Sequence, residues 1–380
     1  MNEDNKRLKY IDAIKGFSVI CVVIIHIIGI DKGITLLLFT HRFAIPVFVF
    51  ITGFLAALYI DKSYIEILSK RLNKMYKLYF IYMCLTYLLI FKSIPLEEIF
   101  LHIISGTINE NYNLALWYAP FYISLCIVFF AIIKFSQTLS NIYGKLFENK
   151  EAFYYIIIFI FSIILSMIGM KITIVKNYYY IKHTLIMIPF ATFGYLIKKI
   201  CDYSFDIINK NKDTFNDRVL AKTKIENCGN NHTGDPYNKF IRDTYNIKIF
   251  IIKLLLLLII FVVFIKSTFA SGYIDIFYLR FQNIMLFYIS TLSATLFLFL
   301  FFYILEPFIK HIFIYGILSH LGKESIHICF LHLLLYPLIG TIVNNFSFIS
   351  ELINNNQSIE KYIYVAILLF ISFICSQIFN

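Results

Sequence analysis

The sequence predicts an all-α, polytopic integral membrane protein with about ten transmembrane helices. Hydrophobic residues make up 59% of its 380 residues and charged residues only 15%, and the mean hydropathy is +0.76. A soluble domain has roughly 45–50% apolar and about 25% charged residues. A bilayer accommodates the surplus, because each spanning helix needs ~20 mostly apolar residues. The composition therefore excludes an ordinary soluble globular domain.

Long apolar runs, separated by polar segments, place the predicted helices in order. Every backbone N–H and C=O must be satisfied internally in hydrocarbon, so runs of this length are expected to be helical. The third and sixth runs are short and are expected to tilt or lie partly in the interface. A further stretch, Ile312–Leu318, is too short to cross and is predicted to be interfacial. The ten predicted spans are Ile11–Ile30, Leu36–Ile60, Tyr76–Phe91, Leu114–Ile133, Phe153–Met170, Ile181–Ile197, Ile247–Ile265, Phe281–Leu305, Ser325–Val343 and Tyr362–Ile378.

The distribution of basic residues predicts the orientation. If both termini are cytoplasmic and ten spans alternate, the cytoplasmic segments hold most of the 34 Lys and Arg residues. This is the bias of positive-inside topology. The net charge of +11 is then carried mainly by loops beside anionic membrane lipid. We expect no nucleic-acid partner.

The chain is predicted to be a single membrane-embedded domain over residues 1–380, with one long polar interruption. Residues 198–246 are rich in Lys, Asn and Asp, and we expect a cytoplasmic loop that is partly disordered or carries a short helix. The seven cysteines form no Cys-x-x-Cys pair. His327 and His332 are five residues apart and do not share a helix face. The sequence therefore predicts no metal site.

Ionisable residues inside spans are costly, so each is a candidate for function. Asp12 and Lys15 are three residues apart at the predicted cytoplasmic edge of the first span and can pair on one helix face. The alternative is a Lys that extends to the interface beside an Asp at the helix start.

A second polar group lies at the predicted outer edge. His26 is about four residues from the end of the first span, and Asp31 follows it. In a continuous helix these two side chains would point ~140° apart, so a His–Asp dyad requires a turn after Gly29–Ile30. Arg42 opposes the positive-inside trend, and we expect it to face a cavity or an acidic partner. A histidine hydrogen-bonded between helices is an equally open interpretation of His26.

A third group lies on the cytoplasmic approach to the third span. Lys70, Lys74 and Lys77 are spaced for one helix face, with Arg71 beside them. The stripe either holds anionic lipid or binds the phosphates of a ligand such as coenzyme A. Spacing alone does not separate these two interpretations.

The order of these motifs resembles the acyltransferase 3 family, multispanning enzymes that acylate hydroxyls of cell-surface carbohydrates. Most of the chain takes part, and residues 198–246 fall outside the likeness. The matching stretches are an opening Asp-x-x-Lys-Gly followed by an apolar run to His26, Arg42–Phe48, Thr52–Leu55, Arg71 with Lys74, Leu116–Tyr118 around the single Trp117, and Leu321–Ser325 through His332.

Three positions depart from the family pattern. Lys15 and Lys74 stand where the family has Arg, and both keep the positive charge but lose the planar fork that makes bidentate contacts. Thr52 replaces Ser and keeps the hydroxyl. These changes affect the affinity or identity of the acyl donor more than the class of reaction.

The resemblance implies transfer of an acyl group, most simply acetyl, from cytoplasmic acyl-CoA to a hydroxyl of a surface polysaccharide, glycolipid or lipid-linked precursor. It also implies a bacterial plasma membrane protein. His26 would deprotonate the acceptor hydroxyl, Asp31 would orient His26, and Arg42 would stabilise negative charge on the thioester oxygen.

The other implied site residues bind the donor or line the substrate path. Those expected at the acyl-CoA site are Lys15, Arg71 and Lys74. Those expected along the acyl or sugar path are Asp12, Trp117 and His332.

Two classes without acyl transfer stay open from the residues alone. A transporter or flippase for a glycan or lipid would also have about ten spans and buried charge, although the chain shows no paired repeat of the kind many transporters have. A scaffold or sensor is the other class, if His26 is only structural.

Overall fold

The computed structural model describes residues 8–28, 35–58, 64–90, 95–107, 114–144, 147, 149–173, 177–226, 236–345 and 357–378. Helices dominate this part of the chain. Two short strands form a hairpin between α8 and α9. The elements are α1 (Lys9–Ile28), α2 (Thr35–Ala56), α3 (Tyr64–Ile90), α4 (Leu96–Ser105), η2 (Leu114–Trp117), α5 (Tyr118–Tyr143), α6 (Lys150–Lys171), η4 (Tyr178–Tyr180), α7 (Ile181–Glu226), α8 (Pro236–Ser271), β1 (Ile274–Asp275), β2 (Arg280–Phe281), α9 (Ile284–Ile309), α10 (Phe313–Lys323), α11 (Ser325–Asn345) and α13 (Gln357–Ile378).

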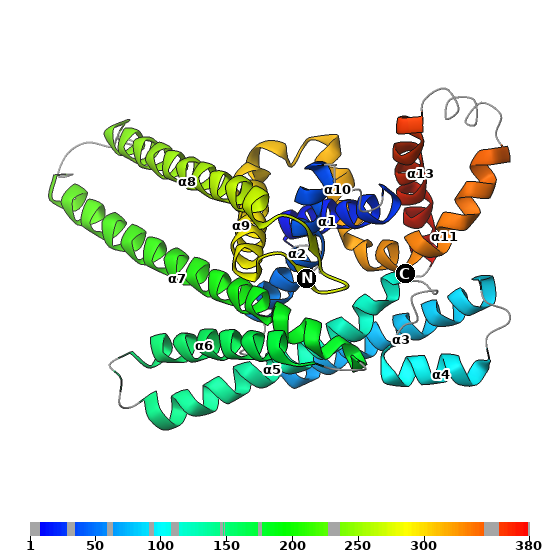
Figure 1. Cartoon of the computed structure of the whole chain (residues 1–380). Helices are drawn as coiled ribbons and strands as arrows, with labels where there is room; N and C mark the ends of the chain where they lie inside the picture. The colour runs from blue at the N-terminus through cyan, green and yellow to red at the C-terminus, as the bar shows by residue number, and fades with distance from the viewer. Residues whose placement is uncertain are drawn as a thin grey trace.

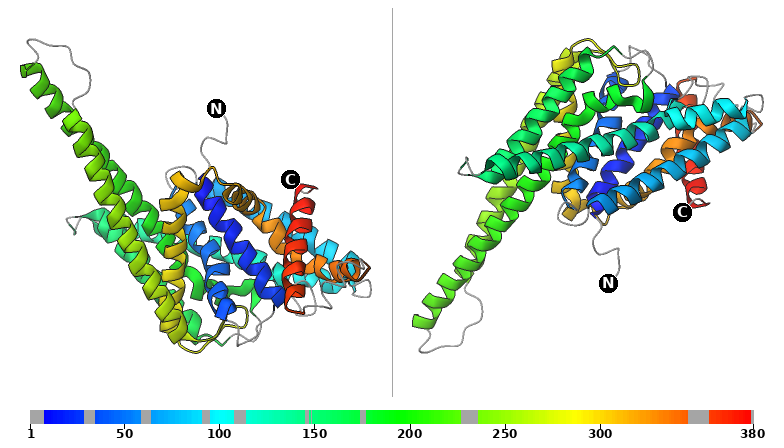
Figure 2. Two further views of the ribbon diagram at one scale, coloured as in Figure 1. Left: turned by 90° about the horizontal axis from the view of Figure 1, so that it is seen from above. Right: turned by 90° about the horizontal axis from the view of Figure 1, so that it is seen from below.

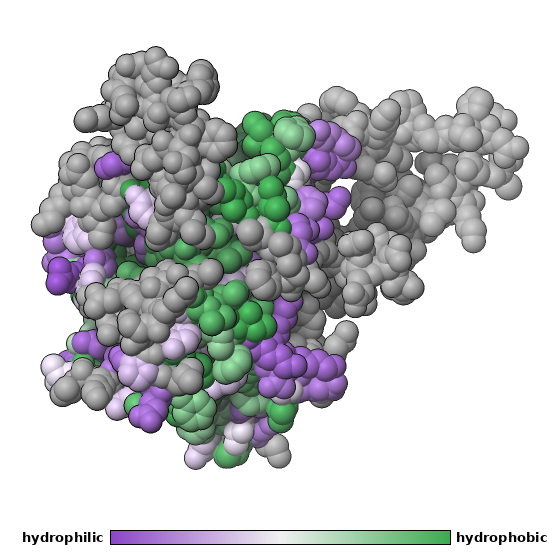
Figure 3. Space-filling view, turned by 90° about the vertical axis from the view of Figure 1, so that its right-hand side faces the viewer, coloured by the Kyte–Doolittle hydropathy of each residue, from purple (hydrophilic) through white to green (hydrophobic). Residues whose placement is uncertain are grey.

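Seven helical segments among the described residues are long and apolar enough to cross a membrane. They are Lys9–Ile27, Leu38–Ala56, Leu114–Tyr143, Lys150–Lys171, Tyr178–Tyr203, Ile249–Ser271 and Ile284–Ile309. The predicted all-α polytopic class is thereby confirmed. Hydrophobic side chains also form a strip across the face shown in Figure 3, with hydrophilic residues on both sides of it.

The other three predicted spans lie in helices that do not meet the same criteria. The third predicted span falls in the second half of α3, whose first half is strongly basic. The ninth and tenth coincide with α11 and α13, and within the residues whose side chains are described these helices contribute the apolar segments Ser325–Tyr336 and Ile363–Ile374. All ten predicted apolar runs therefore lie on helices of the described part of the chain.

Helices α1 and α2 occupy the centre of the bundle (Figure 1). Helix α1 packs mainly on α10 and α2, α2 packs on α7, and α8 packs on α9. Two clusters of buried hydrophobic side chains result, one around α3, α5 and α7 and the other around α1, α2 and α9. The centre of the bundle is thus formed by the two helices that carry most of the motif residues.

Glycines allow the α2 and α7 backbones to approach closely. A Cβ atom on Gly53 would lie 1.8 Å from the Ala191 carbonyl oxygen, and one on Gly194 would lie 2.0 Å from the Phe50 carbonyl oxygen. Small residues at such crossings are how membrane helices gain packing contacts. The glycine of the Thr52–Leu55 motif is therefore explained by helix packing.

We predict that Gly53→Ala lowers the thermal unfolding midpoint, because the methyl group would push two helix backbones apart, a change that costs about 1–3 kcal/mol. Gly316→Ala on α10 is the matched control, since a Cβ there has no neighbour within 4 Å. Equal unfolding midpoints of the two variants in detergent would contradict this account of the crossing.

The polar segment 198–246 differs from the predicted loop. Helix α7 continues to Glu226 and α8 begins at Pro236, and both helices extend beyond the rest of the bundle (Figure 2). Nucleation is the costly step of helix formation. An apolar span that is already helical therefore extends readily into an adjoining polar stretch.

Two short helices carry exposed apolar side chains. Helix α10, which contains most of the predicted interfacial stretch, exposes Phe313 and Ile314. Helix α4 exposes Phe100 and Leu101 and was not predicted. At ten residues, α4 is too short to be recognised as a span, and its two glutamates interrupt the apolar run.

Candidate active site

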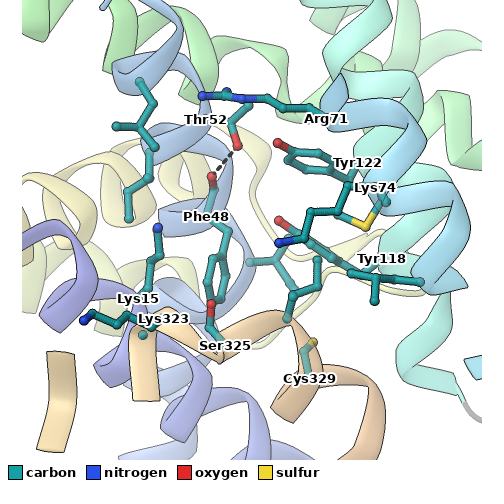
Figure 4. Close-up of a pocket in the computed structure, with 17 residues that line it drawn as sticks. Lys15, Phe48, Thr52, Arg71, Lys74, Tyr118, Tyr122, Lys323, Ser325 and Cys329 are labelled. Atoms are coloured by element: carbon teal, nitrogen blue, oxygen red, sulfur yellow. Dashed lines mark hydrogen bonds between the residues drawn. The ribbon is translucent and has the colours of Figure 1, made fainter. Parts of the chain in front are cut away.

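A cavity of about 300 Å³ is lined by four basic residues, Lys15 from α1, Arg71 and Lys74 from α3, and Lys323 from α10. We call it the cationic cavity. Figure 4 shows Lys15 and Lys323 on one side and Arg71 and Lys74 on the other. None of the described residues that line it is acidic. Its charge suits an anion with several negative groups.

The remaining lining of the cationic cavity combines hydroxyl groups with apolar walls. Tyr118 and Tyr122, one turn apart on α5, point their hydroxyl groups into the space (Figure 4). Thr52 also lines the cavity, and its hydroxyl donates to the Phe48 carbonyl oxygen at 2.8 Å. A ligand with phosphates at one end and an apolar portion at the other would match this lining.

Lys15 is held in place by an ion pair. Its Nζ atom lies 3.3 Å from Asp12 Oδ1, and Asp12 is only 3% exposed. The pairing predicted from their spacing is therefore present. Asp12 itself is not among the residues that line the cationic cavity, so its observed contact positions Lys15.

The basic stripe of α3 divides between two surfaces. Arg71 and Lys74 line the cationic cavity, whereas Lys70 and Lys77 line a neighbouring open groove that also includes Lys74. Lys70 forms an exposed ion pair with Glu66 at 3.0 Å. Only part of the stripe that the sequence predicted for one face thus reaches the cavity.

A second cavity, of about 320 Å³, contains His26 from α1, His41 from α2, Trp117 from η2 and Asp275 from β1 in its lining. We call it the histidine cavity. The ring of His26 lies 5.1 Å from that of His332 on α11, centroid to centroid. His26, Trp117 and His332 were all selected from the sequence, and the structure brings them to one end of the bundle.

Two of these histidines have nitrogens without a hydrogen bond. Among the described residues, Nε2 of His41 and Nε2 of His332 are buried and have no partner. The other ring nitrogen of His332 lies 3.2 Å from the Ile328 carbonyl oxygen, which only accepts. His41 lines the histidine cavity with this hydrogen-bonding capacity unused, whereas His332 contacts the cavity residue His26 but is not part of the lining.

Asp275 is a buried carboxylate that the sequence analysis did not select. The β1–β2 hairpin, in which Asp275 pairs with Arg280, places it at the cavity. Oδ1 accepts from the Tyr278 amide at 3.0 Å, and Oδ2 accepts from the Tyr273 hydroxyl at 3.1 Å. Burial, assisted by the carboxylate, raises the pKa of Tyr273 to about 12. The phenol therefore stays protonated and donates at neutral pH.

His183 on α7 forms a hydrogen bond to this hairpin. Its Nε2 atom donates to the Phe277 carbonyl oxygen at 2.8 Å, so Nδ1 accepts from the Asn177 amide at 2.9 Å. The Trp117 ring lies 5.3 Å from the His183 ring, centroid to centroid. Both nitrogens of His183 have hydrogen-bond partners within the protein, which indicates a structural role in holding the hairpin against α7.

Arg42 lines neither cavity, in contrast to the role predicted for it. Its guanidinium is 1% exposed and donates to the end of α8, at 2.5 Å to Ser271 Oγ and 2.6 Å to the Gly272 carbonyl oxygen. It also bonds the Leu38 carbonyl oxygen. The last carbonyls of a helix have no intrahelical partner and carry partial negative charge. The end of α8 thus satisfies the charge that was expected to need a cavity or an acid.

We predict that Arg42→Gln lowers the free energy of unfolding by about 3 kcal/mol, because it leaves buried acceptors at the end of α8 without donors. Chemical denaturation in detergent would measure the change. Arg280→Gln, at an exposed position of the hairpin, is the control. Transfer activity that falls at Arg42→Gln without loss of stability would instead support a catalytic role.

Asp31, the predicted partner of His26, lies outside the described residues. The described carboxylate in the histidine cavity is Asp275. Other lining residues that the sequence analysis did not select are His41 and, in the cationic cavity, Lys323 and Tyr118. His41 and Tyr118 adjoin residues that were selected, so adjacency within a motif was the available signal.

The two cavities lie toward opposite ends of the same central helices. Lys15 and His26 are eleven residues apart on α1, a separation of about 16 Å along the axis. On α2 the order reverses, with His41 at the histidine cavity and Thr52 at the cationic cavity. Antiparallel packing therefore places one cavity near each end of the bundle.

These features define a polytopic helical membrane protein with a cavity lined by basic residues at one end and a histidine-lined cavity at the other. The family model described as acyltransferase domain, acyltransferase 3, matches residues 8–380. The chain therefore belongs to the acyltransferase 3 family, as the order of its motifs predicted, and is a membrane acyltransferase. Neither the curated proteins nor the solved structures contain a match to it.

Proposed function

We propose that this acyltransferase moves an acyl group, most simply acetyl, from acyl-CoA bound in the cationic cavity to a hydroxyl presented in the histidine cavity. The acceptor class is a surface polysaccharide, a glycolipid or a lipid-linked glycan precursor. The observation that carries the proposal is the placement of four basic side chains and of the histidines in cavities at opposite ends of α1 and α2.

The donor's phosphates would be bound by Lys15, Arg71, Lys74 and Lys323. Charge-assisted hydrogen bonds to phosphate are among the strongest polar contacts in proteins. Arg71 supplies the planar fork of a guanidinium, while the three lysines supply point charges. The hydroxyl of Tyr118 and the apolar walls face the remainder of the donor.

His26 would act as the general base. The acceptor oxygen attacks the thioester carbonyl carbon while His26 takes the hydroxyl proton. When the carbon–sulfur bond breaks, that proton passes to the coenzyme A sulfur, which leaves as the free thiol. Asp275 favours the transient imidazolium because a nearby carboxylate stabilises the charged form. In this scheme Arg42 has a structural role, and the role of Asp31 stays a prediction from sequence.

The cationic cavity would face the cytoplasm, where acyl-CoA is made, and the histidine cavity would face the outside of a bacterial plasma membrane. The basic residues of α1 and α3 at the cationic end agree with the positive-inside rule. Helix α1 begins at that end, so the N-terminus would be cytoplasmic.

The proposal is tested by reconstituting the purified protein in nanodiscs with radiolabelled acetyl-CoA and a polysaccharide extracted from the native host. We expect label in the polysaccharide and release of one thiol per acetyl group. Movement of labelled glycan across vesicles without acylation would overturn the proposal in favour of a transporter or flippase.

A further inference from the structure

The two cavities meet at a single side chain. Of the described residues that line them, Ile45 on α2 belongs to both linings. Its side chain is half-buried and packs against both hydrophobic clusters of the bundle. The position of Ile45 is therefore the point of closest approach between the anion-binding and histidine-lined spaces.

Residues close to each other in the chain line different cavities near this boundary. Trp117 lines the histidine cavity, whereas the next residue, Tyr118, lines the cationic cavity. On α11, Cys329 lines the cationic cavity and His332, three residues further, contacts His26. The partition between the cavities therefore includes Ile45, which lines both, and the adjacent residues Trp117 and Tyr118, which line one each.

The side chains of this partition are apolar or aromatic. Ile45, Trp117, Tyr118 and Cys329 carry no charge at neutral pH, and the basic groups and Asp275 lie on either side of them. An apolar passage favours an acyl chain and disfavours water and ions, whose transfer out of water is costly. Such a layer would let an acyl group through while separating two aqueous spaces.

Building on the proposed function, we infer that Ile45 determines the size of the acyl group that reaches His26. The branched side chain of Ile45 occupies the shared boundary, so its volume limits the chain that fits beside it. The donors that the wild-type protein would use are therefore acyl-CoA thioesters with short chains.

The test compares acetyl-, butanoyl- and hexanoyl-CoA as donors for transfer to the same host polysaccharide. Ile45→Ala should raise the ratio of hexanoyl to acetyl transfer by about tenfold or more, because small differences in pocket volume discriminate between chains at this scale. Ile45→Phe should lower transfer from all three donors, while coenzyme A should raise its thermal unfolding midpoint by as much as we expect for wild type.

Two matched isoleucines separate this effect from a general change of cavity volume. Ile25 lines only the histidine cavity and Ile326 only the cationic cavity, and both are half-buried. Ile25→Ala and Ile326→Ala should leave the ratio of hexanoyl to acetyl transfer near its wild-type value.

A ratio unchanged in Ile45→Ala, or changed equally in the two controls, would overturn the role of Ile45 and leave the proposed acyl transfer intact. A wild-type protein that transfers no acyl group from any of the three donors would overturn both. If Ile45→Phe fails to fold, the chain-length ratio of Ile45→Ala decides the question alone.

Discussion

His26→Gln is expected to reduce acyl transfer at least about a hundredfold, the contribution typical of a positioned general base. Glutamine keeps polar atoms and much of the volume of imidazole but does not accept a proton at neutral pH. The initial rate of acetyl transfer measures the effect. Coenzyme A should still stabilise the variant, because His26 lies about 16 Å along α1 from Lys15 in the cationic cavity.

His311→Gln is the matched control for this experiment. His311 is exposed and lines neither cavity, so its replacement should leave the rate unchanged. If His26→Gln kept more than about a tenth of the wild-type rate, it would contribute less than the usual range for general-base catalysis, and the assignment of His26 would be wrong.

Arg71→Ala is expected to weaken binding of acetyl-CoA by about 10- to 100-fold. A hydrogen bond to a charged group contributes about 1.5–3 kcal/mol, and each 1.4 kcal/mol is a tenfold change in affinity. Arg71 offers the guanidinium among the four basic residues of the cationic cavity. The KM for acetyl-CoA should rise in parallel, with a smaller effect on kcat.

Lys77→Ala tests whether charge alone explains such an effect. Lys77 lies on the same helix, and Lys77→Ala removes the same charge as Arg71→Ala. Lys77, however, lines the neighbouring groove. It should change the KM for acetyl-CoA by less than Arg71→Ala does. Equal effects of the two substitutions would indicate that the basic stripe attracts the donor, or anionic lipid, without a specific site.

Local signals in the sequence predicted the membrane class and the separate basic groups that line the cationic cavity, whereas the placement of Lys15 with Arg71 and Lys74 at one site was implied by the family resemblance. A long apolar run is a strong signal for a spanning helix, and a charge within it, such as Lys15, is conspicuous. Arg71 and Lys74 are three residues apart on one helix. Residues with this spacing share a helix face whatever the rest of the fold does.

The residues that were missed depend on contacts between distant segments. Asp275 joins the histidine cavity only because a two-stranded hairpin packs beside α2, and nothing near it in sequence indicates this. Lys323 lies in a stretch that was recognised as a motif but was not expected to line the cationic cavity. Its place was set by the packing of α10 on α1, where Gly16 and Gly322 allow close approach.

For Arg42, the sequence analysis correctly expected the buried charge to be compensated but did not identify the groups that compensate it. A buried guanidinium must be compensated, and the sequence analysis expected a cavity or an acid. The carbonyl groups at the end of α8 are equally good acceptors, but they lie about 230 positions away in the chain. Only the tertiary fold shows which helix end approaches Arg42.

The central claim, that donor and acceptor are served at opposite ends of one bundle, is tested most directly by transfer across an oriented membrane. Vesicles of known protein orientation would contain host polysaccharide inside, with membrane-impermeant labelled acetyl-CoA added outside. We predict labelling of the enclosed polysaccharide only when the cationic end faces outward. Labelling that requires donor and acceptor on the same side of the membrane would contradict the claim.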